Sequence, residues 1–164
     1  MVLVYGEPIT RWSCMFTECS ARCCRAGREA TIRDVKRISE GTGLKAEDFL
    51  ENHQDRGGLF HLKGRGGRCI FLGDDLRCSL HEKGLKPIFC QMYPFKFKGI
   101  IYADDLVLKV EATKDCPTIG KGDVLTEDFE IAIESLGNRF LKDIEDFIRL
   151  RSQGLSFDEI LAKV

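Results

Sequence analysis

Four cysteines lie between residues 14 and 24, in the stretch WSCMFTECSARCCR, and two of them are adjacent. Four more are spread over the middle of the chain, so its 164 residues carry two groups: Cys14, Cys19, Cys23 and Cys24, then Cys69, Cys78, Cys90 and Cys116. A chain of this length buries a hydrophobic core without covalent cross-links. The cysteines therefore need a chemical explanation, and a site that uses all of them requires distant segments to meet.

The N-terminus favours a reducing compartment. The segment MVLVYGEPITRW has an apolar run of only four residues and no basic residue before it, unlike a signal peptide. No later stretch approaches the length of a membrane span, so we expect a cytoplasmic protein. There, clustered thiols are more often metal ligands or redox catalysts than disulfides. A disulfide scaffold remains an alternative, because hyperthermophiles form disulfides inside the cell.

The charge balance gives no global attraction to polyanions. The chain has 25 basic and 26 acidic residues and a net charge of -1, so we expect neither nucleic acid nor a membrane as a partner. The basic patch KGRGGR, residues 63–68, is short and lacks aromatic residues for base stacking. The glycines of residues 57–67 lack the spacing of a phosphate-binding motif, and we interpret this segment as a strand followed by a flexible loop.

Several local patterns predict secondary structure. Residues 31–40 have an N-cap threonine and apolar residues at helical spacing, which predicts a helix that ends at Gly41. A second short helix is expected over residues 45–52. Residues 95–112 place two β-rich runs on either side of Ala103-Asp104-Asp105, the pattern of a β-hairpin.

The C-terminal third predicts two helices. A long one follows Thr126 and ends near Gly154, with one apolar stripe formed by Phe129, Ile133, Leu136, Phe140, Ile144 and Phe147. Ser156 and Glu159 form a capping box for a last short helix. We therefore predict a helix-dominated α+β fold over residues 1–164, a single domain with one β-hairpin, metal-binding loops and C-terminal helices.

Eight thiols suit two kinds of metal site. Four thiolates satisfy tetrahedral Zn²⁺ or an iron–sulfur cluster. The spacing matches neither the paired CxxC motifs of a zinc ribbon nor the cysteine run of a bacterial ferredoxin, so the metal stays open. Adjacent side chains generally point apart, so we expect Cys23 and Cys24 not to reach one ion easily.

Other residues near the cysteines have two interpretations each. His81, three residues after Cys78, is either a ligand or an outer hydrogen-bond donor, whereas His53 and His61 are expected to serve other roles. The positive charges of Arg25, Arg68 and Lys86 would offset a thiolate site, or are solvated surface charges.

Catalysis by a cysteine without metal is a further alternative. A thiol activated by Arg22, Arg25 or Arg28 would serve as the nucleophile, although the chain has no CxxC oxidoreductase motif. The segment QMYPF after Cys90 would provide an apolar shell around a metal, or ordinary core packing.

The order of these motifs resembles a known family. The N-terminal cluster ending in CCR, the segment RCIFLGDDLRCSLHEKGLKPIFCQMYPF and CPTIGKG are similar to the YkgJ-type cysteine-cluster family, zinc- or iron-chelating domains with a CxxCxxCC signature. The resemblance spans Cys14 to Gly122 and implies that all eight cysteines form the metal site. It also relates the chain to flagellin lysine N-methylases. The gaps after Cys14 and Cys19 are wider than in the signature, which leaves Cys14 as the least secure ligand.

Three functional hypotheses follow. We favour an iron–sulfur cluster over zinc, in a redox, cluster-assisted or metal-handling role, because eight thiols exceed what one structural zinc requires. A lysine N-methylase-like enzyme is the second hypothesis, although we find no S-adenosylmethionine-binding motif and identify no catalytic residues. The third is a structural zinc module whose long C-terminal helix binds a partner protein.

Overall fold

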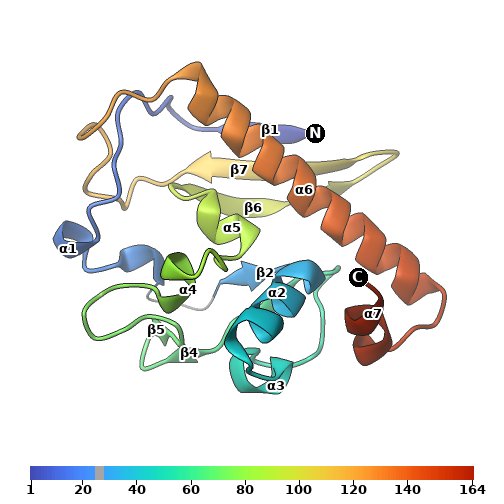
Figure 1. Cartoon of the computed structure of the whole chain (residues 1–164). Helices are drawn as coiled ribbons and strands as arrows, with labels where there is room; N and C mark the ends of the chain where they lie inside the picture. Colours follow the sequence, from blue (N-terminus) through green and yellow to red (C-terminus); the bar gives the residue numbers. More distant parts are fainter. Residues whose placement is uncertain (25–27) are drawn as a thin grey trace.

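The computed structural model describes residues 1–24 and 28–164 and has an α+β fold (Figure 1). Strands β6 (Phe95–Tyr102) and β7 (Leu106–Ala112) form the predicted antiparallel hairpin. Strand β1 (Val2–Tyr5), which we did not predict, pairs in parallel with β7 and gives the sheet order β1-β7-β6. The N-terminal segment is thereby fixed beside a strand that comes about two thirds of the way along the chain.

Helix α6 (Glu127–Ser152) runs across this sheet, as Figure 1 shows. Its predicted apolar stripe is confirmed: four of the six residues are buried, and Phe129 and Leu136 are half-buried against the same core. All of them except Phe147 join Leu108 and Val110 of β7 in an apolar cluster that we call the sheet cluster, and Phe147 belongs to a second cluster described next. Helix α6 crosses the sheet and continues to α2 and α7, so it contacts both parts of the core.

A second apolar cluster, the helical cluster, lies between α2 (Ile32–Thr42), α3 (Ala46–Phe49), α7 (Phe157–Lys163) and the small sheet of β2 (Glu29–Ala30) and β3 (Phe60–His61). Helix α2 begins after Thr31 as predicted but ends at Thr42, with Gly43 as its C-cap instead of Gly41. Helix α3 is shorter than the predicted 45–52. The capping box of α7 is present as predicted.

The glycine-rich segment is a second hairpin, not the flexible loop that we expected. Strands β4 (Gly64–Arg65) and β5 (Arg68–Cys69) pair antiparallel. Gly66 and Gly67 form the two-residue turn with φ values of 58° and 74°, which glycine adopts without strain. The hairpin fixes the backbone of Cys69.

Four one-turn helices lie around the cysteines and were not predicted: α1 (Phe16–Cys19), the 3-10 helix η1 (Arg22–Cys24), α4 (Ser79–Glu82) and α5 (Ile88–Gln91). In Figure 1, α1, η1 and α4 lie together on the left side of the molecule, away from the C-terminal end of α6. Within the described part of the chain, no helix is both long and apolar enough to cross a membrane.

Candidate metal centre

The fold brings the two groups of cysteines into one region. The pKa of Cys14 responds to Cys19, Cys23 and Cys116, and that of Cys24 responds to Cys23, Cys78 and Cys90. Cys69 is coupled in the same way to Cys23 and Cys78, and Cys90 to Cys69. Each of the eight thus lies close enough to another to influence its charge. All eight are free thiols in this structure.

Backbone and side-chain hydrogen bonds join the segment before Cys14 to the loop after Cys116. The Trp12 amide donates to the Asp123 carbonyl at 3.0 Å, and the Ser13 hydroxyl donates to the Asp123 carboxylate at 2.8 Å. Arg11 donates to the Gly122 carbonyl at 2.7 Å. These bonds hold the first and the last cysteine of the chain at one end of the region.

Cys69 and Cys78 meet because the chain between them folds back on itself. The Leu72 amide donates to the Cys69 carbonyl at 3.0 Å, and Leu72 forms an isolated bridge with Cys78. Cys69 is buried in the helical cluster, and Cys24 and Cys78 pack against it. Three cysteines from three separate segments therefore share one apolar environment.

A buried carboxylate positions the helix that carries Cys90. Asp34 is fully buried and accepts hydrogen bonds from the Ile88 amide, at 3.2 Å, and from the Thr31 amide, at 3.1 Å. Arg37 donates to its other oxygen at 2.5 Å. Burial raises the pKa of Asp34, although these bonds oppose the shift. Asp34 thereby fixes the start of α5 against the start of α2.

The expectation that Cys23 and Cys24 point apart is wrong. In η1 their Sγ atoms lie 3.7 Å apart, close to the spacing of about 3.8 Å between two sulfurs on one tetrahedral ion with metal–sulfur bonds of about 2.3 Å. The hydrogen bond with Cys24 lowers the pKa of Cys23 to about 6 against the effect of burial, and the pKa of Cys24 is correspondingly raised. The two thiols are therefore shifted in opposite directions, and Cys23 ionises more readily than Cys24.

The remaining shifts differ across the region. Burial raises the pKa of Cys69, and it raises the pKa of Cys90 to about 12. Cys14 is exposed, and its pKa is raised by partial desolvation and by the neighbouring Cys23. Burial also acts on Cys116, but hydrogen bonding, including that with Thr118 at 3.2 Å, outweighs it and lowers the pKa of this thiol. A bound metal must therefore displace protons from several of these thiols.

In the described part of the chain, the candidate ligands are not arranged as a complete metal site. Among residues 1–24 and 28–164, no group of three or more His, Cys, Asp or Glu side chains is arranged to hold an ion as it stands. His81 is exposed on α4, so its role as a ligand stays a prediction, and His53 stacks on Phe157 with ring centroids 4.5 Å apart.

The positive charges are distributed differently from the prediction. Lys86 acts on Cys14, Cys23 and Cys90, in line with its predicted role. Arg68 instead donates to the Gly73 carbonyl at 2.6 Å, and Arg25 lies outside the described residues.

Arg28 was named above only as an activator of a nucleophilic thiol. Its charge helps to lower the pKa of Cys23 and opposes the rise that burial causes in the pKa of Cys69 and Cys90. Its sequence position suggested an effect on the nearby cysteines of the CC pair, but gave no sign that it would also reach Cys69 and Cys90.

Two unpaired donors show that thiolates fit this region. Within the described residues, the buried side-chain atoms without a hydrogen-bond partner are Trp12 Nε1 and Arg28 Nη2. Both residues influence candidate ligands, since Trp12 helps to lower the pKa of Cys116 although its N–H does not reach hydrogen-bonding geometry. Metal-bound thiolates are acceptors with negative charge, so they suit the chemistry of these two donors.

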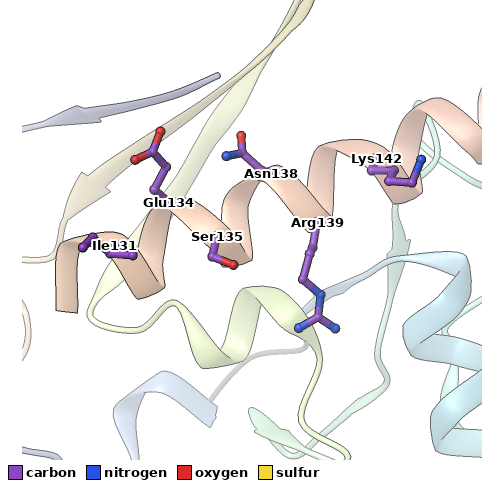
Figure 2. A pocket seen from close by; sticks show the side chains of 6 residues that line it. All are labelled: Ile131, Glu134, Ser135, Asn138, Arg139 and Lys142. Atoms are coloured by element: carbon purple, nitrogen blue, oxygen red, sulfur yellow. The ribbon is translucent and has the colours of Figure 1, made fainter. Parts of the chain in front are cut away.

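Two surface hollows lie away from the cysteines. One, of about 470 Å³, runs along α6 and is lined by that helix alone, as Figure 2 shows: Ile131, Glu134, Ser135, Asn138, Arg139 and Lys142. The other, of about 350 Å³, lies where β3 faces β6 and includes His61 and Phe97. A shallow hollow on a single helix is weak evidence for a small-molecule site, so the cysteine region remains the candidate centre.

Comparison with known proteins agrees with this geometry. A family model described as "CxxCxxCC: Putative zinc- or iron-chelating domain" matches residues 13–120, a range that contains all eight cysteines. No curated protein and no solved structure gives a significant match. Metal chelation by the cysteines is therefore supported by the family model as well as by the convergence of the thiols.

Proposed function

Since the chain belongs to the CxxCxxCC family of zinc- or iron-chelating domains, we propose that its cysteines hold an iron–sulfur cluster, with Zn²⁺ as the alternative. The observation that carries the proposal is the convergence of eight free thiols from separate segments, with the Cys23 and Cys24 sulfurs 3.7 Å apart. Thiolates ligate both kinds of centre. When bound, an iron–sulfur cluster would supply electron-transfer chemistry, and zinc would supply a structural or Lewis-acid centre.

The aromatic surroundings favour the cluster over zinc. The Trp12 and Tyr93 rings lie 6.0 Å apart, and burial together with the neighbouring Cys116 raises the pKa of the Tyr93 phenol. An apolar shell limits water access and tunes the potential of a cluster. We therefore infer a redox, cluster-assisted or metal-handling role for the centre. From the sequence we also infer a cytoplasmic protein with one domain over residues 1–164.

A structural zinc module that binds a partner protein is the second candidate. Ile131 is 57% exposed on the outer face of α6, next to the hollow of Figure 2. An exposed apolar side chain between polar neighbours is a feature of partner-binding helices as well as of ordinary surfaces. This candidate predicts a colourless, redox-silent protein. A lysine N-methylase-like activity would additionally require binding of S-adenosylmethionine, which calorimetry on the metal-loaded protein measures directly.

The deciding experiment is anaerobic purification followed by an absorption spectrum and analysis of iron, acid-labile sulfide and zinc on one sample. Iron with sulfide and a brown colour would support the cluster. Stoichiometric zinc in a colourless sample would support the second candidate. A protein that retains none of these metals under anaerobic conditions, and takes up none on reconstitution, would refute both.

Substitution of single cysteines tests the ligand set. We expect Cys23→Ser, Cys24→Ser and Cys90→Ser each to lower metal stoichiometry and soluble yield, because each removes a thiolate from the centre. Ser135→Ala, at an exposed position of α6 away from the cysteines, is the control and should keep the wild-type metal content. Unchanged stoichiometry in all three cysteine variants would contradict the assignment.

A further inference from the structure

The two buried donors without a partner belong to distant parts of the sequence and meet the cysteine region at different places. Trp12 lies beside Cys116, and Arg28 acts on Cys23, Cys69 and Cys90. Buried N–H groups are nearly always satisfied in folded proteins. Two exceptions at one candidate centre indicate that the acceptors belong to the metal-loaded state.

The backbone of Arg28 is fixed by a hydrogen bond, whereas its Nη2 atom has no hydrogen-bond partner in the described part of the chain. Its carbonyl accepts from the Leu62 amide at 3.0 Å, directly before β2, and α5 packs against β2. The Arg28 side chain therefore extends from the residue directly before β2, the strand against which the Cys90 helix α5 packs. A buried guanidinium nitrogen without an acceptor destabilises the fold that contains it, because desolvation is not compensated.

Trp12 is held in the same way, by backbone and by ring packing. Its amide donates to the Asp123 carbonyl, and its ring packs at 6.0 Å from Tyr93 and at 6.3 Å from Phe129. None of these contacts uses the indole N–H. The ring is thus fixed with its single donor buried beside the thiol of Cys116.

We propose that Arg28 and Trp12 are positioning residues of the metal centre, which donate hydrogen bonds to its metal-bound thiolate sulfurs and, through Arg28, offset its negative charge. This inference rests on the proposed function, because the acceptors are the loaded cysteines. Donors of this kind raise the affinity of a site for its metal, and their loss typically costs about 10- to 100-fold. In an iron–sulfur protein they also raise the reduction potential.

The proposal predicts opposite effects of one substitution on two states. Arg28→Met keeps the length and apolar stem of the side chain but removes the charge and the donors. The metal-free protein should resist urea as well as wild type or better, because an unsatisfied buried group has been removed. Metal affinity should fall about 10- to 100-fold. If Arg28 served only packing, its substitution would lower the urea resistance of the metal-free protein and would not lower metal affinity alone.

Trp12→Phe makes the corresponding test at the other end of the centre. It keeps an aromatic ring against Tyr93 and Phe129 and removes the indole N–H. We expect lower metal affinity with little change in the metal-free protein. Arg28→Lys, which keeps the charge but not the fork of donors, should lie between wild type and Arg28→Met.

The experiment titrates metal-free protein with Zn²⁺ against a chromophoric chelator and measures urea unfolding of both states. Arg151→Met and Tyr102→Phe are the matched controls, since Arg151 bonds Leu155 and Tyr102 bonds Gly57, away from the thiols. Both should keep wild-type affinity. If the purified protein contains a cluster, the midpoint potential replaces the titration and should become more negative in Arg28→Met and Trp12→Phe.

The outcomes separate this inference from the proposed function. Wild-type protein that takes up no metal refutes the proposed function itself. Wild-type uptake with unchanged affinity in Arg28→Met and Trp12→Phe leaves that function intact and overturns the present inference. Loss of stability in the metal-free variants without loss of affinity also overturns it, because it assigns both side chains to packing.

Discussion

Replacing Asp34 with alanine should be among the most destabilising single changes to this protein, and it should act on the metal centre as well. Asp34 is the N3 residue of the capping box of α2 and has no exposed surface. Its carboxylate accepts from the amides of Thr31 and Ile88 and from the side chain of Arg37. The substitution removes all three acceptor contacts and leaves two buried amides unpaired.

The magnitude follows from those contacts. Each buried amide left without an acceptor costs about 1–3 kcal/mol. Arg37 adds little, because its side chain is about one third exposed and still donates to the Lys86 carbonyl at 3.1 Å. We therefore expect Asp34→Ala to lower the free energy of unfolding by about 3–5 kcal/mol.

Asp48→Ala is the matched control, since Asp48 is the N3 residue of the capping box of α3 but is exposed. It accepts from the Lys45 amide at 2.9 Å and does not contact α5. Loss of such a cap costs about 1 kcal/mol. Urea unfolding followed by circular dichroism, with all proteins at equal metal content, measures the difference. Equal losses in the two variants would refute the argument from burial, and full metal retention in Asp34→Ala would refute the link to Cys90.

Three further predictions concern other parts of the molecule. His81→Ala should leave metal stoichiometry unchanged, because the side chain is exposed; loss of metal by elemental analysis would make His81 a ligand. The hydrogen bond from Arg33, at 2.7 Å, lowers the pKa of Asp146, so its stabilising contribution is present above the ordinary value of 3.8 and is lost as pH falls through the lower folded value. Asp146→Asn should accordingly flatten the acid-unfolding curve below that pH, and parallel curves for variant and wild type would exclude this role. Gly122→Ala should lower stability by about 1–3 kcal/mol in the same urea assay, because Gly122 has φ of 80° and a Cβ there would meet the Ser13 backbone nitrogen at 2.9 Å; wild-type stability would show that the loop adapts.

The sequence predicted the elements whose signals are local. Thr31 with Asp34 and Ser156 with Glu159 form the capping boxes that begin α2 and α7. The apolar stripe of α6 and the hairpin of β6 and β7 also follow from spacing alone. In each case neighbouring residues carry the information that fixes the element.

Elements that depend on distant partners were missed. Strand β1 is four residues long and exists because β7 offers it a parallel edge, and the one-turn helices at the cysteines are too short for periodicity to identify. The effect of each arginine on the thiols likewise depends on packing between distant segments. Arg28 influences the thiols through the packing of β2 and α5, whereas Arg68, adjacent to Cys69 in sequence, bonds elsewhere.

The parallel pairing of β1 with β7 has a consequence for how the protein matures. Val2 pairs with Leu108, so the segment before Cys14 gains its strand partner only after most of the chain has been synthesised. Non-local parallel pairing is also slow to form. During synthesis of the intervening residues, the thiols of Cys14 to Cys24 are present before the cysteines of the second group, which lie near them in the folded protein, have been made. Metal is therefore expected to enter at a late stage of biosynthesis, and oxidants have access to the first four cysteines before it does.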